Sequence, residues 1–258
     1  MLEAPVGQGG SLRTRGRWRL GLSPTLLLQI GRCDLPSSCT GQPQVTDAAR
    51  DGEVVMQDRQ RHWDEAYRTR GSAGVSWFQA EPTMSLELIN SMDVESTRPV
   101  IDIGGGASLL VDHLVARGFA AIEVLDLSKT ALEEARARIG SDTQVRWTHQ
   151  DVLTWEPTRR YGLWHDRAVF HFLTDESDQQ RYAEILATSI EPNGVVIIAT
   201  FAKDGPEFCS GLPVARYSGD ELLGALGLSF KEVRVTREVH VTPAGAVQPF
   251  TWVAARTR

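Results

Sequence analysis

Cysteines, long apolar runs and an excess of basic residues are scarce or absent in this sequence. Its 258 residues include only 3 cysteines, Cys33, Cys39 and Cys209. Such an odd and sparse set is no disulfide framework. Cys33 and Cys39 also lack a second Cys/His pair at zinc-site spacing, so we expect no metal. The cysteine content favours reduced thiols and a cytoplasmic location.

The rest of the composition narrows the range of partners. No apolar run approaches the roughly 20 residues that span a bilayer, so we expect no membrane partner. The formal net charge is −6 and the pI about 5.6. Because nucleic-acid binding usually needs clustered lysine and arginine, this mildly acidic balance argues against a nucleic-acid partner. The length and the 41% hydrophobic content fit one well-buried α/β domain.

Residues 1–55 differ in composition from the rest of the chain. Alternating arginines are followed by a short apolar run at residues 26–28 and then by a stretch rich in Pro, Ser and Gly. We expect a disordered N-terminal extension here and a folded domain at residues 56–258. A targeting segment and a natural start at Met56 are the alternatives.

After Pro99 the sequence alternates between short apolar runs and helical periodicity. The predicted strands are residues 100–103, 121–125, 144–147, 162–165, 195–200, 230–241 and 248–255. The predicted helices are residues 58–70, 82–91, 108–117, 128–139, 175–189 and 220–226. Strands joined by helices imply a largely parallel sheet with helices on both faces. The last two strands have too short a connection for a crossover, so they should form an antiparallel hairpin.

The turn after the first predicted strand is rich in glycine and follows a carboxylate. Asp102 ends the strand, and Gly104 and Gly106 let the backbone approach a ligand closely. A dinucleotide fingerprint would need a further glycine where Leu109 stands, so NAD is disfavoured. Asp102 suits a cofactor with an amine, such as the methionine ammonium of S-adenosylmethionine.

Two further carboxylates follow the next two strands. Asp126, with Leu127 after it, is placed to accept hydrogen bonds from both ribose hydroxyls of a nucleotide. Asp151 is placed to accept from the adenine amine, while the backbone of Val152 donates to the ring. Three carboxylates after three successive strands predict a site for an adenosine-containing cofactor.

At this point the sequence resembles the class I, seven-stranded, Rossmann-like methyltransferase family. The resemblance spans about residues 57–258 and implies S-adenosylmethionine as cofactor. Asp102, Gly104 and Gly106 resemble its first motif, with Ser108 in place of the third glycine. Residues 163–171 resemble its fourth motif, at the edge of the methyl-transfer pocket. The closest likeness is to a bacterial branch of small methyltransferases with unassigned substrates, through three groups of residues: His62, Trp63, Asp64 and Tyr67, then Ser76, Trp77, Phe78 and Gln79, then Asp166, Arg167 and His171.

The aromatic residues before the glycine turn have two interpretations. At helical spacing they fit a core stripe, and they equally fit a lid that covers the adenosine. We assign Trp63 to the cofactor and Trp77 to the substrate.

Residues in and after the fourth motif are the candidates for catalysis. We predict Asp166 and His171 as catalytic residues, because a base is needed if the acceptor arrives protonated. His165 should lie on the opposite face of its strand from Asp166. Arg216 lies where substrate loops of this fold often occur, so we assign it to the substrate.

The predicted function is methyl transfer from S-adenosylmethionine to a small molecule. The acceptor atom (N, O, S or C) and the oligomeric state stay open. A loose similarity to eukaryotic lysine methyltransferases, which carry an Asp-Lys pair where this chain has Asp166 and Arg167, makes protein-lysine methylation the alternative. A non-catalytic nucleotide-binding module or an NAD-dependent enzyme is the alternative from another class.

Overall fold

The computed structural model describes residues 47–141 and 143–258, with side chains from Asp58 onward. Residues 1–46 of the predicted extension lie outside the described part. Helix α1 (Asp47–Arg70) begins eleven residues before the predicted position at 58. Residues 47–55, which we assigned to the extension, therefore belong to this helix.

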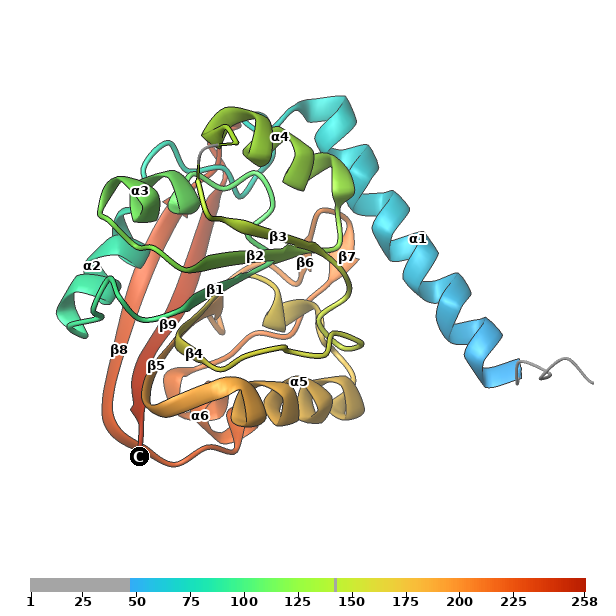
Figure 1. The fold of residues 1–258 in the computed structure, drawn as a ribbon. Coiled ribbons are helices and arrows are strands. Elements are labelled where there is room, and N and C mark those ends of the chain that lie inside the picture. The colour runs from blue at the N-terminus through green and yellow to red at the C-terminus, as the bar shows by residue number, and fades with distance from the viewer. Residues whose placement is uncertain (1–46, 142) are drawn as a thin grey trace, which may run out of the picture. The chain divides into compact units, whose positions relative to one another are not determined.

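A seven-stranded sheet forms the centre of the molecule (Figure 1). Its order is β3-β2-β1-β4-β5-β9-β8, and only β9 runs antiparallel to its neighbours, as the predicted mostly parallel sheet with a C-terminal hairpin requires. The strands are β1 (Val100–Ile103), β2 (Ile122–Asp126), β3 (Arg146–His149), β4 (Tyr161–Arg167), β5 (Ile190–Phe201), β8 (Phe230–Val241) and β9 (Val247–Thr257). The central strands β1, β2 and β4 are buried almost throughout, which explains their continuous apolar runs.

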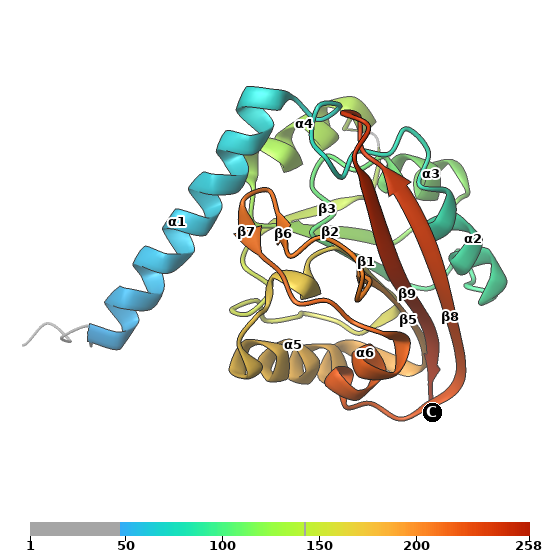
Figure 2. The same ribbon diagram turned by 180° about the vertical axis from the view of Figure 1, so that it is seen from behind.

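Helices pack on both faces of this sheet (Figures 1 and 2). One core joins the apolar sides of α2 (Thr83–Ser91), α3 (Leu110–Ala116) and α4 (Lys129–Ile139) to the sheet. The opposite core contains α5 (Glu176–Ser189) and α6 (Gly219–Leu226). Ser128 caps α4 as predicted, since its hydroxyl accepts a hydrogen bond from the Ala131 amide at 3.2 Å.

Three features were not predicted. A 3₁₀ turn, η1 (Phe170–Phe172), follows β4. Two short strands, β6 (Phe208–Cys209) and β7 (Leu212–Pro213), form a separate hairpin after β5. The predicted turn at residues 192–194 is an irregularity inside β5, where Asn193 has a φ of 58°.

Strand register brings the predicted site residues to one edge of the sheet. Ile103 of β1 is paired with Leu125 of β2 and with Asp166 of β4, and Asp126 is paired with His149 of β3. The segments that follow these four strands therefore lie side by side. This edge is where open α/β sheets bind their ligands. Separately, no helix within the described residues is long and apolar enough to cross a membrane.

Candidate functional site

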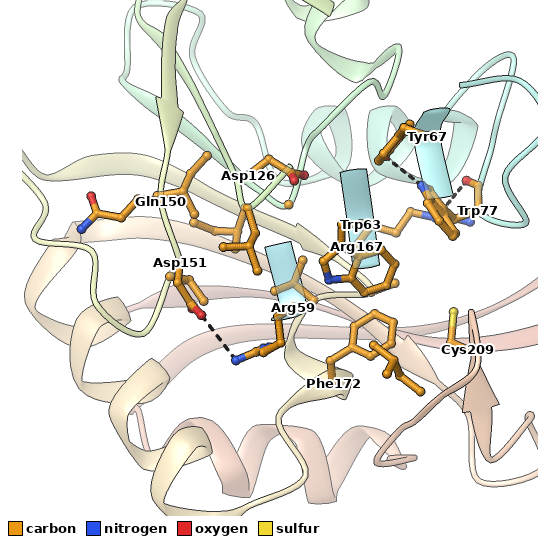
Figure 3. Close-up of a pocket in the computed structure, with 18 of the residues that line it drawn as sticks. Arg59, Trp63, Tyr67, Trp77, Asp126, Gln150, Asp151, Arg167, Phe172 and Cys209 are labelled. Carbon is orange, nitrogen blue, oxygen red and sulfur yellow. Dashed lines mark hydrogen bonds and ion pairs between the residues drawn. The ribbon is translucent and has the colours of Figure 1, made fainter. Parts of the chain in front are cut away.

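A cavity of about 250 Å³ opens at this edge (Figure 3). We call one side the strand wall, formed by Gly104, Leu125, Asp126, Leu127, Asp151 and Val152. The other side, the hairpin wall, is formed by Arg167, Ala168, Phe172, Cys209, Leu212 and Pro213. Three aromatic residues, Trp63, Tyr67 and Trp77, also line the cavity, and we call them the aromatic lid. In Figure 3, Asp126 and Asp151 lie on one side and Cys209 on the other.

Asp126 ends β2 and lines the cavity. Its Oδ1 accepts a hydrogen bond from the Ser128 amide at 2.6 Å, which fixes the orientation of the carboxyl group. Burial raises the pKa of Asp126 to about 7. A buried carboxyl group facing a cavity is well suited to accept hydrogen bonds from a ligand's hydroxyl groups.

Asp151 lines the cavity in the same wall as Asp126. Its Oδ1 accepts from the Leu153 amide at 3.0 Å, and its Oδ2 lies 3.4 Å from Nη1 of Arg59 on α1. Leu127 and Val152, the residues after the two strand-end positions, line the same wall as predicted. Sequence reasoning missed Arg59, because its contact with Asp151 depends on how α1 packs beside the end of β3.

The glycine turn has two different geometric roles. Gly104 lines the cavity with a φ of +65°, and a Cβ there would lie 2.0 Å from the Val169 side chain. Gly106 does not line the cavity. A Cβ on Gly106 would lie 2.8 Å from both the Asp126 carboxylate and the Tyr67 hydroxyl, so this glycine permits close packing beneath the site.

Asp102 faces a second, smaller cavity of about 50 Å³ rather than the larger one. Its Oδ1 lies 2.7 Å from Nδ1 of His165, whose Nε2 lies 2.9 Å from the Ser85 hydroxyl. Gly104, Tyr67 and Arg167 line both cavities, so the two are neighbours. One oxygen of Asp102 is thus engaged by a histidine that sequence reasoning had left out of the site.

Aromatic residues of the lid pack in an apolar cluster of the protein and also line the cavity. Tyr67 is buried in a small apolar cluster and also lines the cavity. Trp77 donates from Nε1 to the Tyr67 hydroxyl at 3.0 Å. The Trp63 ring meets the rings of Trp77 and Phe172 edge to face, with centroids 5.6 and 5.0 Å apart. Asp64 anchors helix α1, which carries Trp63 and Tyr67, by accepting hydrogen bonds from the Ser128 hydroxyl and the Thr130 amide.

Asp166 and His171, predicted as catalytic, are not among the residues that line either cavity. Asp166 is fully buried on the α5 face of β4, where it accepts from the Tyr182 hydroxyl at 2.6 Å and from the Val169 amide at 2.8 Å. His165 points to the opposite face, which confirms the predicted alternation. The geometry gives Asp166 a structural role, holding the turn after β4.

His171 is equally buried. Its ring packs against Phe172 and Phe201, and its Nδ1 accepts from the Phe201 amide at 3.4 Å. Burial lowers its pKa to about 3, so the ring is neutral at physiological pH. Because the imidazole lines neither cavity and packs against Phe172 and Phe201, a packing role replaces the catalytic assignment, although its Nε2 is buried without a hydrogen-bond partner in the described residues.

Arg216, predicted to contact substrate, lines neither cavity. It donates to the Gly205 carbonyl and pairs with Glu207 at 2.9 Å. The arginine that does line both cavities is Arg167, at the end of β4. The hairpin bearing Cys209 was also missed, although the Ser210-Gly211 dipeptide, with φ of 50° and 82°, is a typical two-residue hairpin turn.

Within the described residues, no group of three or more His, Cys, Asp or Glu side chains is placed to hold a metal ion.

Comparison with known proteins bears on the cofactor. Residues 100–194 match the family described as a methyltransferase domain. The chain is 22% identical over 113 residues to malonyl-(acyl-carrier protein) O-methyltransferase 2 of Ilyobacter polytropus. That match covers 43% of this chain and 42% of the relative, so the chain spans about two fifths of the relative's length.

Solved structures share the architecture. A chain from a study of the conversion of a disulfide bond into a thioacetal group during echinomycin biosynthesis has a TM-score of 0.62 at 20% identity, covering 77% of this chain and 92% of that one. The 1,6-didemethyltoxoflavin-N1-methyltransferase of Burkholderia thailandensis, solved with bound 1,6-didemethyltoxoflavin and S-adenosylhomocysteine, has a TM-score of 0.55 at 15% identity, covering 85% of this chain and 94% of that one. At such identities the likeness establishes the fold. Together with the family match, it identifies residues 100–194 as a methyltransferase domain within a seven-stranded, Rossmann-like fold.

Proposed function

We propose that this protein transfers a methyl group from S-adenosylmethionine to a small-molecule acceptor. The observation that carries this proposal is the cavity at the strand ends, where Asp126 and Asp151 face a common space beneath Trp63 and Trp77. The carboxylates that an adenosine needs lie in the strand wall, and the hairpin wall lines the rest of the same cavity.

The strand wall fits the cofactor residue by residue. Asp126 would accept from the ribose hydroxyls, and Asp151 from the adenine amine once Arg59 shares or releases it. Leu127 and Val152 would line the adenosine, and Gly104 would let the methionine part pass close to the backbone. When bound, the cofactor supplies a sulfonium methyl that is already a strong electrophile.

The task left to the protein is therefore alignment and exclusion of water. Proximity and orientation supply roughly 7–11 kcal/mol in favourable cases. In the hairpin wall the titratable side chains are Arg167 and Cys209, and burial raises the pKa of Cys209 to about 11. The described chain thus places no base with a near-neutral pKa in that wall. An acceptor that arrives with a free lone pair suits this site best.

Three observations favour a small acceptor over a protein lysine. Aromatic side chains line the cavity, and the cation of Arg167 would repel an ammonium group. The relatives named above are described as acting on a carrier-protein-bound malonyl group and on didemethyltoxoflavin. Action in the cytoplasm, without a nucleic-acid or membrane partner, completes the proposal on the basis of composition.

The test is calorimetric titration of S-adenosylhomocysteine into the purified chain, with NAD as the competing cofactor. We expect micromolar binding of S-adenosylhomocysteine and no heat with NAD. Asp126→Ala should abolish the binding, and Asp126→Asn, which retains an oxygen for the Ser128 amide, controls for local structure. A folded protein that ignores S-adenosylhomocysteine would contradict the proposed function.

A further inference from the structure

Arg167 occupies an unusual position for a cation. It is the last residue of β4 and lines both cavities. Its Nη1 donates to the Trp77 carbonyl at 3.0 Å, and its guanidinium carbon lies 4.8 Å from the centre of the Phe250 ring. These contacts fix the plane of the guanidinium group without neutralising its charge.

The rest of the guanidinium group has no partner. Nε and Nη2 are buried with almost no surface open to either cavity, so a ligand reaches them only as the covering side chains move aside, and neither has a hydrogen-bond acceptor within residues 47–141 and 143–258. Buried donors nearly always have acceptors, so two unmatched donors on one side chain need an explanation. A bound ligand supplies one.

The nearest acidic side chain does not serve this role. Glu238 of β8 acts on Arg167 only through longer-range attraction. Its Oε1 accepts from Gln79 at 2.9 Å and its Oε2 from the Trp252 indole at 2.8 Å. No salt bridge within the described chain includes Arg167, whereas Arg59, the other arginine of the larger cavity, is paired with Asp151.

The two unmatched nitrogens define the shape of the missing partner. Since Nη1 is occupied, Nε and Nη2 form the remaining edge of the planar group. Two parallel N–H donors on such an edge match the two oxygens of a carboxylate. A neutral acceptor with one oxygen would leave one of the two donors unmatched.

We propose that the methyl acceptor carries a carboxylate, which Arg167 binds through Nε and Nη2 in the hairpin wall. This inference rests on the proposed function, because it names the substrate class of the same site. It makes Arg167 a residue that determines specificity and excludes cationic acceptors from the cavity. A carboxylate is already ionised at neutral pH, so its binding needs no proton transfer.

The methionine carboxylate of the cofactor has the same chemistry and must be separated from that of the acceptor. The test is therefore made on protein saturated with S-adenosylhomocysteine, which brings its own carboxylate. Nitrogen-15 NMR follows the arginine Nε–H resonances during titration with acetate and, as an isosteric neutral control, acetamide. Arg167→Lys identifies the Arg167 resonance by its disappearance.

We expect acetate at millimolar concentrations to shift the Arg167 resonance saturably, and acetamide to leave it unchanged. The Trp77 indole N–H, in the adjoining lid, reports binding in all variants and also reports folding. Arg167→Met should weaken acetate binding about tenfold to a hundredfold, the loss expected for a charged hydrogen-bonded pair. Arg234→Met, at an exposed arginine of β8 that lines neither cavity, should bind acetate as the unmodified protein does.

Two results would overturn the inference. One is an Arg167 resonance that acetate does not shift in protein that binds S-adenosylhomocysteine normally. The other is an Arg167→Met variant that loses S-adenosylhomocysteine at least tenfold but keeps 5′-methylthioadenosine, which lacks the carboxylate. That pattern would assign Arg167 to the cofactor. Failure of S-adenosylhomocysteine to bind the unmodified protein would instead contradict the proposed function itself.

Discussion

The two walls of the cavity are built in different ways. The strand wall consists of residues at the end of β2 or shortly after β1, β2 and β3, so adjacent strands bring them together. The hairpin wall combines the end of β4 with the β6–β7 hairpin, segments that are about forty residues apart in the chain. The first wall can be deduced from the order of strands, whereas the second depends on how a distant hairpin packs.

Two buried carboxylates sharpen this contrast. Burial raises the pKa of Asp126 to about 7 and that of Asp166 to about 6. Asp126 lines the cavity, whereas the oxygens of Asp166 accept from Tyr182 and from the amides after β4. A raised pKa therefore marks burial, and only exposure to the cavity separates a ligand-binding carboxylate from a structural one.

The strongest test of this contrast compares alanine substitutions of the two carboxylates. We expect Asp126→Ala to weaken S-adenosylhomocysteine binding about a hundredfold or more, since two charge-assisted hydrogen bonds are lost. Asp166→Ala should change the affinity less than about threefold. A larger change would require the loss of a hydrogen bond to the ligand, and we expect Asp166 to make none. Calorimetric titration measures both, and equal losses would mean that the two carboxylates serve the same site.

A second comparison concerns the glycines. Gly104→Ala should lower the free energy of unfolding by about 3 kcal/mol, since strain at positive φ adds to a steric clash with Val169. Gly118→Ala has the same kind of φ, +81°, but no atom within 4 Å of the new Cβ, so about 1 kcal/mol is expected. Urea denaturation of both variants measures the difference. Equal values would show that the close approach of Val169 relaxes at no cost.

The structural role given to Asp166 predicts a loss of stability. Asp166→Ala leaves the Tyr182 hydroxyl and two backbone amides without their acceptor, which should cost about 2 kcal/mol. Thermal denaturation should show this loss, with Tyr182→Phe producing a smaller one. Unchanged stability would reopen a functional role for Asp166.

The smallest effect is a pH dependence of cofactor binding. Because the folded pKa of Asp126 is about 7 and its ordinary value 3.8, the folded protein holds the extra proton between these pH values. The contribution of this proton to the free energy of unfolding is lost as the pH rises through 7. Binding through the ionised carboxylate should run the opposite way, gaining at most about tenfold per pH unit up to pH 7. Asp126→Asn should flatten the affinity profile, and a profile unchanged by that variant would assign the titration elsewhere.

Much of the site followed from sequence because strand ends impose it. Asp126, Asp151 and Gly104 line one cavity because parallel neighbours must bring their C-terminal ends together, whereas their contact with a cofactor stays a prediction. Ser128 as the cap of α4 followed from local backbone chemistry alone. Both kinds of inference need only nearby sequence.

The remaining residues depend on packing that nearby sequence does not encode. Alternation along β4 separated His165 from Asp166, but it did not say that Asp166 faces Tyr182 of α5. Arg216 was assigned by its loop position, whereas its actual partner is Glu207, nine residues away in the same loop. Arg167 was quoted only as part of a motif, because its orientation toward the cavity depends on Trp77 and Phe250.

The place of β9 in the sheet has a consequence for how the protein is made. Among the described residues β9 follows both β5 and β8 in sequence, yet it lies between them in the sheet. During synthesis β5 emerges well before it, so the apolar stretch at residues 195–201 waits with an open edge of unpaired N–H and C=O groups. Such an edge is a template for pairing with another polypeptide. The β5 edge of the nascent chain therefore stays open to such pairing until β9 has been made, and this long-range closure should also slow folding.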